Sequence, residues 1–152
     1  MSPDEIRACV ARLDTRHVGE ADKAWGELRH LGNAVVPYLL EEFRRAKRSE
    51  LRVALVFHAI RFAQTSDDAI SLGLEALKDR ATLVRYRACG LLAYSLRRDA
   101  LPELRGLLSH HDTRTVADAK AAIDAIENQN HHLFVDRDHS GRVKWDVAGD
   151  RE

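Results

Sequence analysis

Apolar residues recur along most of this chain at intervals of three and four, the spacing that places them on one face of an α-helix. The first such segment begins with Ser2, Pro3 and Glu5, a pattern typical of a capping box with proline in the first turn. Short loops between successive segments predict antiparallel neighbouring helices. We predict helices over about residues 3–13, 20–31, 34–47, 49–64, 66–79, 82–96, 99–109 and 113–128.

These segments repeat at a nearly constant interval. Val53 and Val84 lie 31 residues apart, and Val84 and Val116 lie 32 apart. Residues 68–70 match residues 99–101, again at an offset of 31. One helical hairpin cannot bury its apolar face alone, whereas stacked hairpins share a continuous core. The interval therefore predicts an all-α array of about four stacked hairpins.

The clearest repeat, residues 69–93, resembles a HEAT repeat of the short bacterial kind. The resemblance is carried by residues at the end of its first helix and along its second: Leu74, Ala76, Leu77, Asp79, Val84, Arg85, Ala88 and Leu91. Residues 34–60 resemble the pattern again, and residues 100–126 do so more weakly, because Ala117 stands where the pattern has arginine. The resemblance implies a right-handed α-solenoid over about residues 20–128. It implies little about function, because HEAT arrays perform many tasks.

The helical spacing stops after Asn130. We therefore divide the chain into a HEAT-like repeat domain, residues 1–130, and a C-terminal segment, residues 131–152. Val143, Trp145 and Val147 alternate with polar residues, which is strand spacing. We predict a β-hairpin over about residues 132–147, which caps the last helix pair because an isolated hairpin is only marginally stable in water.

The turn of this hairpin has part of the spacing of a calcium-binding loop. Asp136, Asp138 and Ser140 offer oxygen ligands at alternate positions, and Gly141 follows them. Val147 stands where such a loop has a bidentate glutamate. A weak calcium site at Asp136, Asp138 and Ser140 is therefore one interpretation. The other is a tight polar turn, in which the Asp and Ser side chains bond to their own backbone.

Composition and charge set limits on partners and compartment. The 152 residues carry 24 basic and 24 acidic groups, so the net charge gives no argument for a nucleic-acid partner. Residues 41–100 hold twelve basic and eight acidic groups, a mildly basic middle, whereas residues 101–152 hold seven and ten. Cys9 and Cys89 lie within helical apolar patterns, which predicts buried free thiols and fits a reducing, cytoplasmic location. No apolar run is long enough to span a membrane.

Catalytic patterns are missing from the sequence, which contains no GxSxG, P-loop, GxGxxG or CxxC motif. The adjacent histidines at 110–111 and 131–132 point to different sides of an element and chelate poorly. A zinc site drawn from the second pair and His139 has no support from spacing. His58 lies in an apolar helix and is predicted to be half-buried. Iron-dependent HEAT hydroxylases carry His-Glu dipeptides, and this chain has none. We therefore predict a protein that is not an enzyme.

The remaining candidates lie on the second helix of each hairpin, which lines the concave face in HEAT arrays. Arg52 and Arg85 occupy near-equivalent positions in successive repeats. Arginine is favoured in interfaces because its planar fork pairs with carboxylates. We predict a partner-binding face that consists of Arg52, Arg61, Arg85, Arg87 and Tyr86. The alternative is that the arginines brace neighbouring repeats through Asp or Glu.

These observations predict a non-enzymatic module that binds a protein on its concave face. In its small size and its lack of a catalytic pattern, the chain most concretely resembles an immunity protein. Such a protein inhibits a cognate bacterial toxin by covering the toxin's surface. The alternatives are a nucleic-acid-binding protein, through about residues 44–61 and 78–98, and a HEAT-like lyase or enzyme accessory. We expect no membrane partner, and no cofactor apart from the weak calcium site.

Overall fold

The computed structural model describes residues 1–147, and all regular structure in this part of the chain is helical. The α-helices are α1 (Pro3–Ala11), α2 (Val18–Leu28), α3 (Val36–Arg45), α4 (Ser49–Ala59), α5 (Asp67–Ala76), α6 (Thr82–Ser95), α7 (Leu101–Gly106) and α8 (Thr113–Glu127). Short 3-10 turns lie at Arg29–Val35, Ile60–Phe62, Arg98–Ala100, Leu107–Ser109 and His131–Phe134. The all-α class is confirmed, and each α-helix begins within two residues of its predicted start.

Side chains define where several helices begin. The predicted capping box is present at α1, where the Ser2 hydroxyl accepts a hydrogen bond from the Glu5 amide and the Glu5 carboxylate accepts one from the Ser2 amide. Ser66 caps α5 by accepting from the Ala69 amide at 3.2 Å. Asp112 caps α8. These caps satisfy amide groups that the first turn of a helix leaves without partners.

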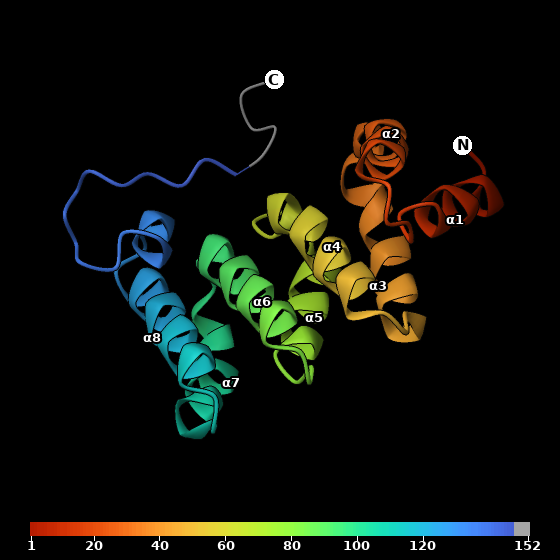
Figure 1. Cartoon of the computed structure of the whole chain (residues 1–152). Coiled ribbons are helices and arrows are strands. Elements are labelled where there is room, and N and C mark those ends of the chain that lie inside the picture. The colour runs from red at the N-terminus through yellow and green to blue at the C-terminus, as the bar shows by residue number, and fades with distance from the viewer. Residues whose placement is uncertain (148–152) are drawn as a thin grey trace.

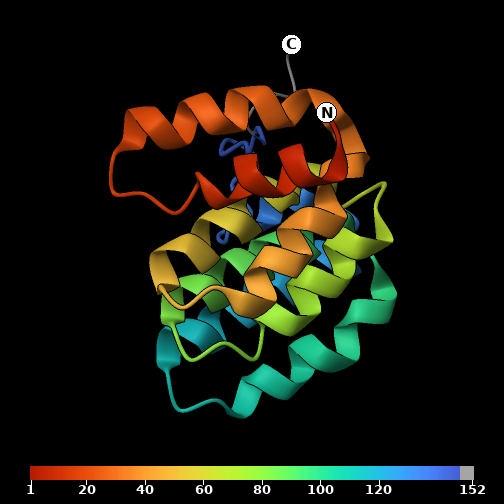
Figure 2. The ribbon, with the colours of Figure 1, turned by 90° about the vertical axis from the view of Figure 1, so that its right-hand side faces the viewer.

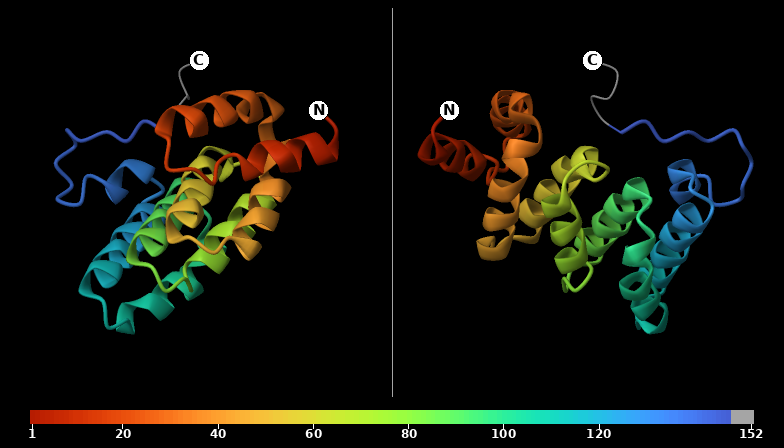
Figure 3. Two further views of the ribbon diagram at one scale, coloured as in Figure 1. Left: turned by 45° about the vertical axis from the view of Figure 1, so that its right-hand side comes forward. Right: turned by 180° about the vertical axis from the view of Figure 1, so that it is seen from behind.

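The helices pack as successive pairs. α3 packs against α4, α5 against α6, and α7 against α8, and the pairs stack through contacts of α4 with α6 and of α6 with α8. Figure 1 shows α4, α6 and α8 in one row with α5 and α7 behind them, and Figure 3 shows the same arrangement from two other sides. α1 and α2 lie across the N-terminal end of these rows (Figure 2). Since every pair adds to the same row, apolar faces of neighbouring pairs form one core.

That core is made mainly of leucine and alanine. Leu55 on α4, Leu72 on α5 and Leu91 on α6 have no exposed surface. Cys9 and Cys89 are buried free thiols, as the sequence predicts. Burial raises the pKa of the Cys89 thiol to about 12, because the interior disfavours a thiolate.

The contact between α5 and α6 depends on a glycine. A Cβ atom at Gly73 would lie 2.8 Å from Cδ2 of Leu91 and 3.2 Å from Cδ2 of Leu92. Distances this short are repulsive, so a larger residue would force the two leucines to move. Gly73 therefore allows α5 and α6 to approach closely.

The predicted β-hairpin over residues 132–147 is wrong, because this part of the chain contains no β-strand. It begins with the 3-10 turn His131–Phe134, continues through a polar turn, and ends in an extended segment. Trp145 is half-buried and Val147 is buried, whereas Val143 is 46% exposed. The alternating pattern thus arises from an extended segment that lies on helices and has no partner strand. The last five residues of the predicted C-terminal segment, 148–152, lie outside the described residues.

Within residues 1–147, no helix has both the length and the hydrophobicity needed to cross a membrane.

Candidate functional site

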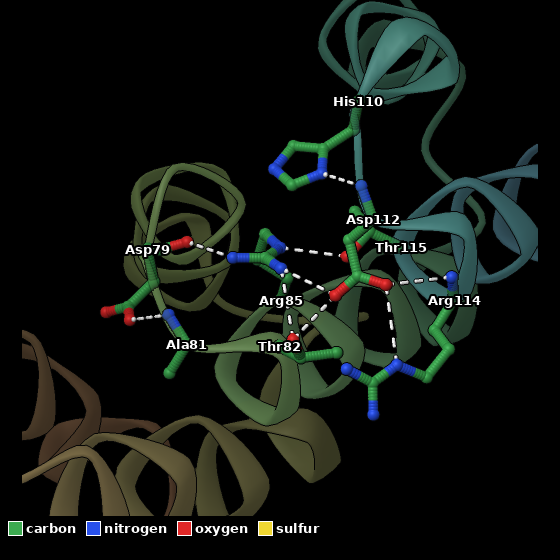
Figure 4. A network of polar contacts seen from close by, with 8 residues as sticks. All are labelled: Asp79, Ala81, Thr82, Arg85, His110, Asp112, Arg114 and Thr115. Carbon is green, nitrogen blue, oxygen red and sulfur yellow. Dashed lines mark hydrogen bonds and ion pairs between the residues drawn. The ribbon is translucent and has the colours of Figure 1, made fainter.

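Arg85 lies inside the chain, with only 4% of its surface exposed. Its Nε donates to Oγ1 of Thr115 at 2.9 Å, and one terminal nitrogen donates to the carbonyl oxygen of Asp79 at 2.8 Å. The other terminal nitrogen donates to Oγ1 of Thr82 at 3.2 Å and to Oδ2 of Asp112 at 3.1 Å (Figure 4). Arg85 therefore ties the loop before α6 to the start of α8.

Arg52 repeats this arrangement one pair earlier. Its Nε and one terminal nitrogen donate to the two carboxylate oxygens of Asp79, at 2.7 and 3.2 Å. Its remaining nitrogen donates to the carbonyl oxygens of Ala46 and Lys47. The pairs Arg52–Asp79 and Arg85–Asp112 each join residues 27 positions apart. The same brace thus recurs at successive junctions of the array.

Arg52 and Arg85 therefore do not fit the partner-binding role that the sequence predicts for them. Arg52 is 7% exposed, and every guanidinium nitrogen of Arg52 and Arg85 donates to an acceptor within the chain. Almost no surface of either side chain remains for a partner. The structure places both in the bracing role that the sequence left open.

Asp112 is the acceptor at the centre of the second brace. Its carboxylate accepts hydrogen bonds from the Thr82 hydroxyl at 2.7 Å and from the Arg114 amide at 2.9 Å (Figure 4). These bonds hold its pKa well below the usual range of an aspartate, because they stabilise the charged form. The backbone amide of Asp112 donates to Nδ1 of His110. The Asp112 carboxylate is therefore charged at neutral pH and joins the start of α6 to the start of α8.

A groove of about 320 Å³ lies between α2, α4, α6 and the C-terminal segment. In Figure 1, α2 and the C-terminal segment lie on opposite sides of the view, with α4 and α6 below them. We call this feature the groove. Its lining residues are Asp22, Trp25, Arg29, Phe57, His58, Ile60, Arg61, Arg87, Trp145, Asp146 and Val147. The groove brings together residues from three helix pairs and from the C-terminal segment.

One wall of the groove is a stack of rings. The imidazole of His58 lies parallel to the Trp25 indole, with ring centroids 4.1 Å apart. The Arg61 guanidinium lies 5.7 Å from the Trp25 ring centroid, within range of a cation–π interaction. Burial, with a further contribution from the charge of Arg61, lowers the pKa of His58 to about 4. His58 is therefore neutral near pH 7.

Arg87 of α6 also lines the groove. Its guanidinium lies 4.8 Å from the Phe57 ring centroid and 5.3 Å from that of Tyr86. Phe57 is 39% exposed, although it is a large apolar residue. Within residues 1–147, Arg87 forms no ion pair. Arg87 and Phe57 therefore present charge and apolar surface that the chain itself does not fully use.

Of the predicted binding residues, Arg61 and Arg87 thus line the groove. Tyr86 lies beside it and packs against Phe134, with ring centroids 5.7 Å apart. Sequence reasoning missed Trp25 and Phe57. Phe57 precedes Arg61 by four positions and so shares its helix face, a signal that could have found it. Trp25 comes from another hairpin, and no sequence spacing indicates its place.

In the loop with calcium-like spacing, residues of the loop itself donate hydrogen bonds to both carboxylate oxygens of Asp136. Oδ1 of Asp136 accepts hydrogen bonds from the amide and the hydroxyl of Ser140, and Oδ2 accepts one from the Gly141 amide at 2.8 Å. Gly141 has a φ of +75°, and Asp138 is exposed. In the part of the chain that the structure describes, no three His, Cys, Asp or Glu residues are placed to hold a metal. The arrangement is that of the tight polar turn.

In comparisons with known proteins, no family model matches the chain, and no curated protein or solved structure shows a significant match.

Proposed function

We propose that this chain is a non-enzymatic binding module, a right-handed solenoid of HEAT-like hairpins whose groove receives a protein partner. The observation that carries this proposal is the meeting of Arg61 and Arg87 with the rings of Trp25 and Phe57 in one accessible groove. Arginine and aromatic side chains carry a large share of the binding energy at protein interfaces, above all where they form pockets.

The size of the groove indicates how a partner would use it. A volume of about 320 Å³ accommodates one or two side chains. A stable complex buries about 800 Å² on each partner, so the groove would hold the anchor and the surrounding faces of α4 and α6 would form the rim. Arg87 forms no ion pair in residues 1–147, which favours a partner that brings a carboxylate.

The most concrete form of the proposal is an immunity protein that inhibits a cognate toxin. Such an inhibitor covers the toxin surface and needs a shape that is set before binding, because a rigid binder loses less entropy. The buried braces Arg52–Asp79 and Arg85–Asp112 support this, since they fix neighbouring helix pairs without any ligand.

Affinity capture from the lysate of the native organism tests the proposal. The baits are the wild-type chain, Arg87→Glu, Phe57→Ala and the matched control Arg98→Glu, which reverses an exposed arginine outside the groove. We expect one stoichiometric protein with the wild type and with Arg98→Glu, and its loss with Arg87→Glu. Titration of the purified partner should show affinity lowered about thirtyfold or more by Phe57→Ala, as for an interface hot spot.

Two results would contradict the proposal. Equal capture by Arg87→Glu and Arg98→Glu would place the interface elsewhere. Recovery of nucleic acid that salt removes, with no protein, would favour the nucleic-acid-binding alternative.

A further inference from the structure

One side of the groove is formed by the C-terminal segment of the chain. After the polar turn, the chain runs back from beyond α8 over α6 toward α4 (Figures 1 and 3). Trp145, Asp146 and Val147 then line the groove together with residues of α2 and α4. Val147 is only 7% exposed. The segment 143–147 therefore lies on the helices as an extended peptide would.

The backbone of this segment is held by two histidines. The amide of Trp145 donates to Nδ1 of His132 at 2.9 Å. The carbonyl oxygen of Trp145 lies 3.1 Å from Nε2 of His131, and since a carbonyl can only accept, His131 is the donor. Adjacent histidines thus bond to both polar groups of one peptide residue. Such contacts do not depend on the side chain, so another extended peptide can make them equally well.

The side chain of Trp145 has a seat on α6. Its ring centroid lies 5.5 Å from that of Phe134 and 5.9 Å from that of Tyr94. The floor of the seat is Gly90, where a Cβ atom would lie 3.4 Å from the Trp145 ring and 3.2 Å from the Phe134 ring. Absence of a side chain at this position therefore leaves a flat surface for an aromatic ring.

Three of the five residues of the segment are exposed to solvent. Val143 is 46% exposed, and Lys144 and Asp146 are exposed as well. The helices α4, α6 and α8 pack through contacts that do not involve the segment. Its departure would uncover the Trp145 seat and the Val147 contact and would leave the helical core intact.

We propose that residues 143–147 are an intramolecular ligand of the surface that α2, α4 and α6 form, and that the partner displaces them with an extended peptide segment. That segment would place an aromatic residue in the Trp145 seat and an acidic residue after it, near Arg61 and Arg87. The inference rests on the proposed function and adds the class of ligand and its regulation. A tethered segment competes at a high effective concentration, so the intact chain binds the partner more weakly than a chain whose seat is vacant.

A labelled peptide with the sequence of residues 142–147, Arg-Val-Lys-Trp-Asp-Val, tests this directly by fluorescence polarisation. The receptors are the full-length wild type and full-length Trp145→Ala/Val147→Ala, which vacates the seat. We expect saturable binding to the double variant, at least about tenfold tighter than to the wild type. Replacing the peptide's tryptophan with alanine should abolish binding, and so should adding Gly90→Met to the double variant.

Circular dichroism establishes that the double variant keeps its helices. If it does not, full-length Trp145→Ala alone takes its place, because this variant vacates the seat and keeps the buried Val147 side chain and both histidines. Absence of peptide binding to a folded variant would overturn the inference, and so would equal binding to wild type and variant. A wild-type dimer that Trp145→Ala/Val147→Ala abolishes would show exchange of the segment between two copies and would also overturn it.

Failure of this inference can be told apart from failure of the proposed function. If a protein partner is captured and requires Arg87, but the peptide does not bind, only the intramolecular-ligand inference is contradicted. Tryptophan-dependent binding of the peptide, with no protein partner captured, would support the seat and leave the proposed function contradicted.

Discussion

Replacing Arg85 with alanine should destabilise the whole array. The side chain donates to acceptors in the loop before α6, in α6 and at the start of α8, and Thr115, one of these acceptors, has no exposed surface. The substitution removes all of these bonds at once and leaves a cavity between two helix pairs. The Thr115 hydroxyl and the Asp79 carbonyl then lose a donor where water has little access.

The expected loss follows from the burial of the pair. Removing one partner of a buried ion pair costs about 3–5 kcal/mol. Asp112 keeps its bonds from Thr82 and the Arg114 amide, so we expect the lower end, about 3 kcal/mol. For a chain of this size that corresponds to a melting temperature lower by about 6–12 °C. The loss of stability for Arg85→Lys should be smaller than that for Arg85→Ala but greater than zero. One ammonium group cannot donate to every acceptor that the planar guanidinium reaches.

Urea unfolding followed by circular dichroism measures this loss. The control is Arg105→Ala, which removes an exposed pair with Glu127 whose side chains are 53% and 55% exposed. That variant should lose no more than about 1 kcal/mol. A loss below about 1 kcal/mol for Arg85→Ala, with unchanged helicity, would refute the view that the buried arginines brace the array.

Three further predictions follow from glycine packing and from burial. Gly73→Ala should lower the free energy of unfolding by about 1–3 kcal/mol, although alanine has the better helix propensity. Gly26→Ala should raise it by about 0.5–1 kcal/mol, because a Cβ atom at Gly26 would meet nothing within 4 Å. Thermal or urea unfolding measures both changes. Burial lowers the pKa of His58 from 6.5 to about 4, so between these pH values the folded state binds fewer protons than the unfolded state. The free energy of unfolding should therefore fall by roughly 2 kcal/mol from pH 7.5 to pH 5. Urea titrations of His58→Phe should not show this loss. The Cys89 thiol, with a pKa of about 12, should react with a thiol reagent at pH 8 only as the chain unfolds, so a rapid reaction in the native state that Cys89→Ser removes would contradict its burial.

The helices could be predicted from the sequence because their signals are local. Capping at Ser2 and Ser66 and the spacing of apolar residues depend only on near neighbours, and the structure places the helices accordingly. The C-terminal segment was misassigned because alternation shows only that one face of an extended chain is covered. Alternation does not reveal that Trp145 bonds to histidine side chains and has no partner strand.

The candidate site required the packed structure. Arg52 and Arg85 have nearly equivalent positions in sequence, but the aspartate that each one pairs with lies 27 residues away and meets it only when the pairs stack. Arg87 lies two residues from Arg85, yet it faces the groove while Arg85 is buried. A helix turns by about 100° per residue, so residues two positions apart lie on nearly opposite faces of the helix. The repeat pattern alone does not indicate which arginine faces outward.

Hydrogen–deuterium exchange with and without the captured partner tests the central claim most directly. If the groove is the binding surface, exchange should slow in peptides that cover residues 57–61, at the end of α4 and in the turn after it, and residues 86–94 of α6. Exchange in residues 143–147 should accelerate at the same time, since the partner displaces them. Slowing confined to α3, α5 and α7, with the groove unchanged, would contradict the account.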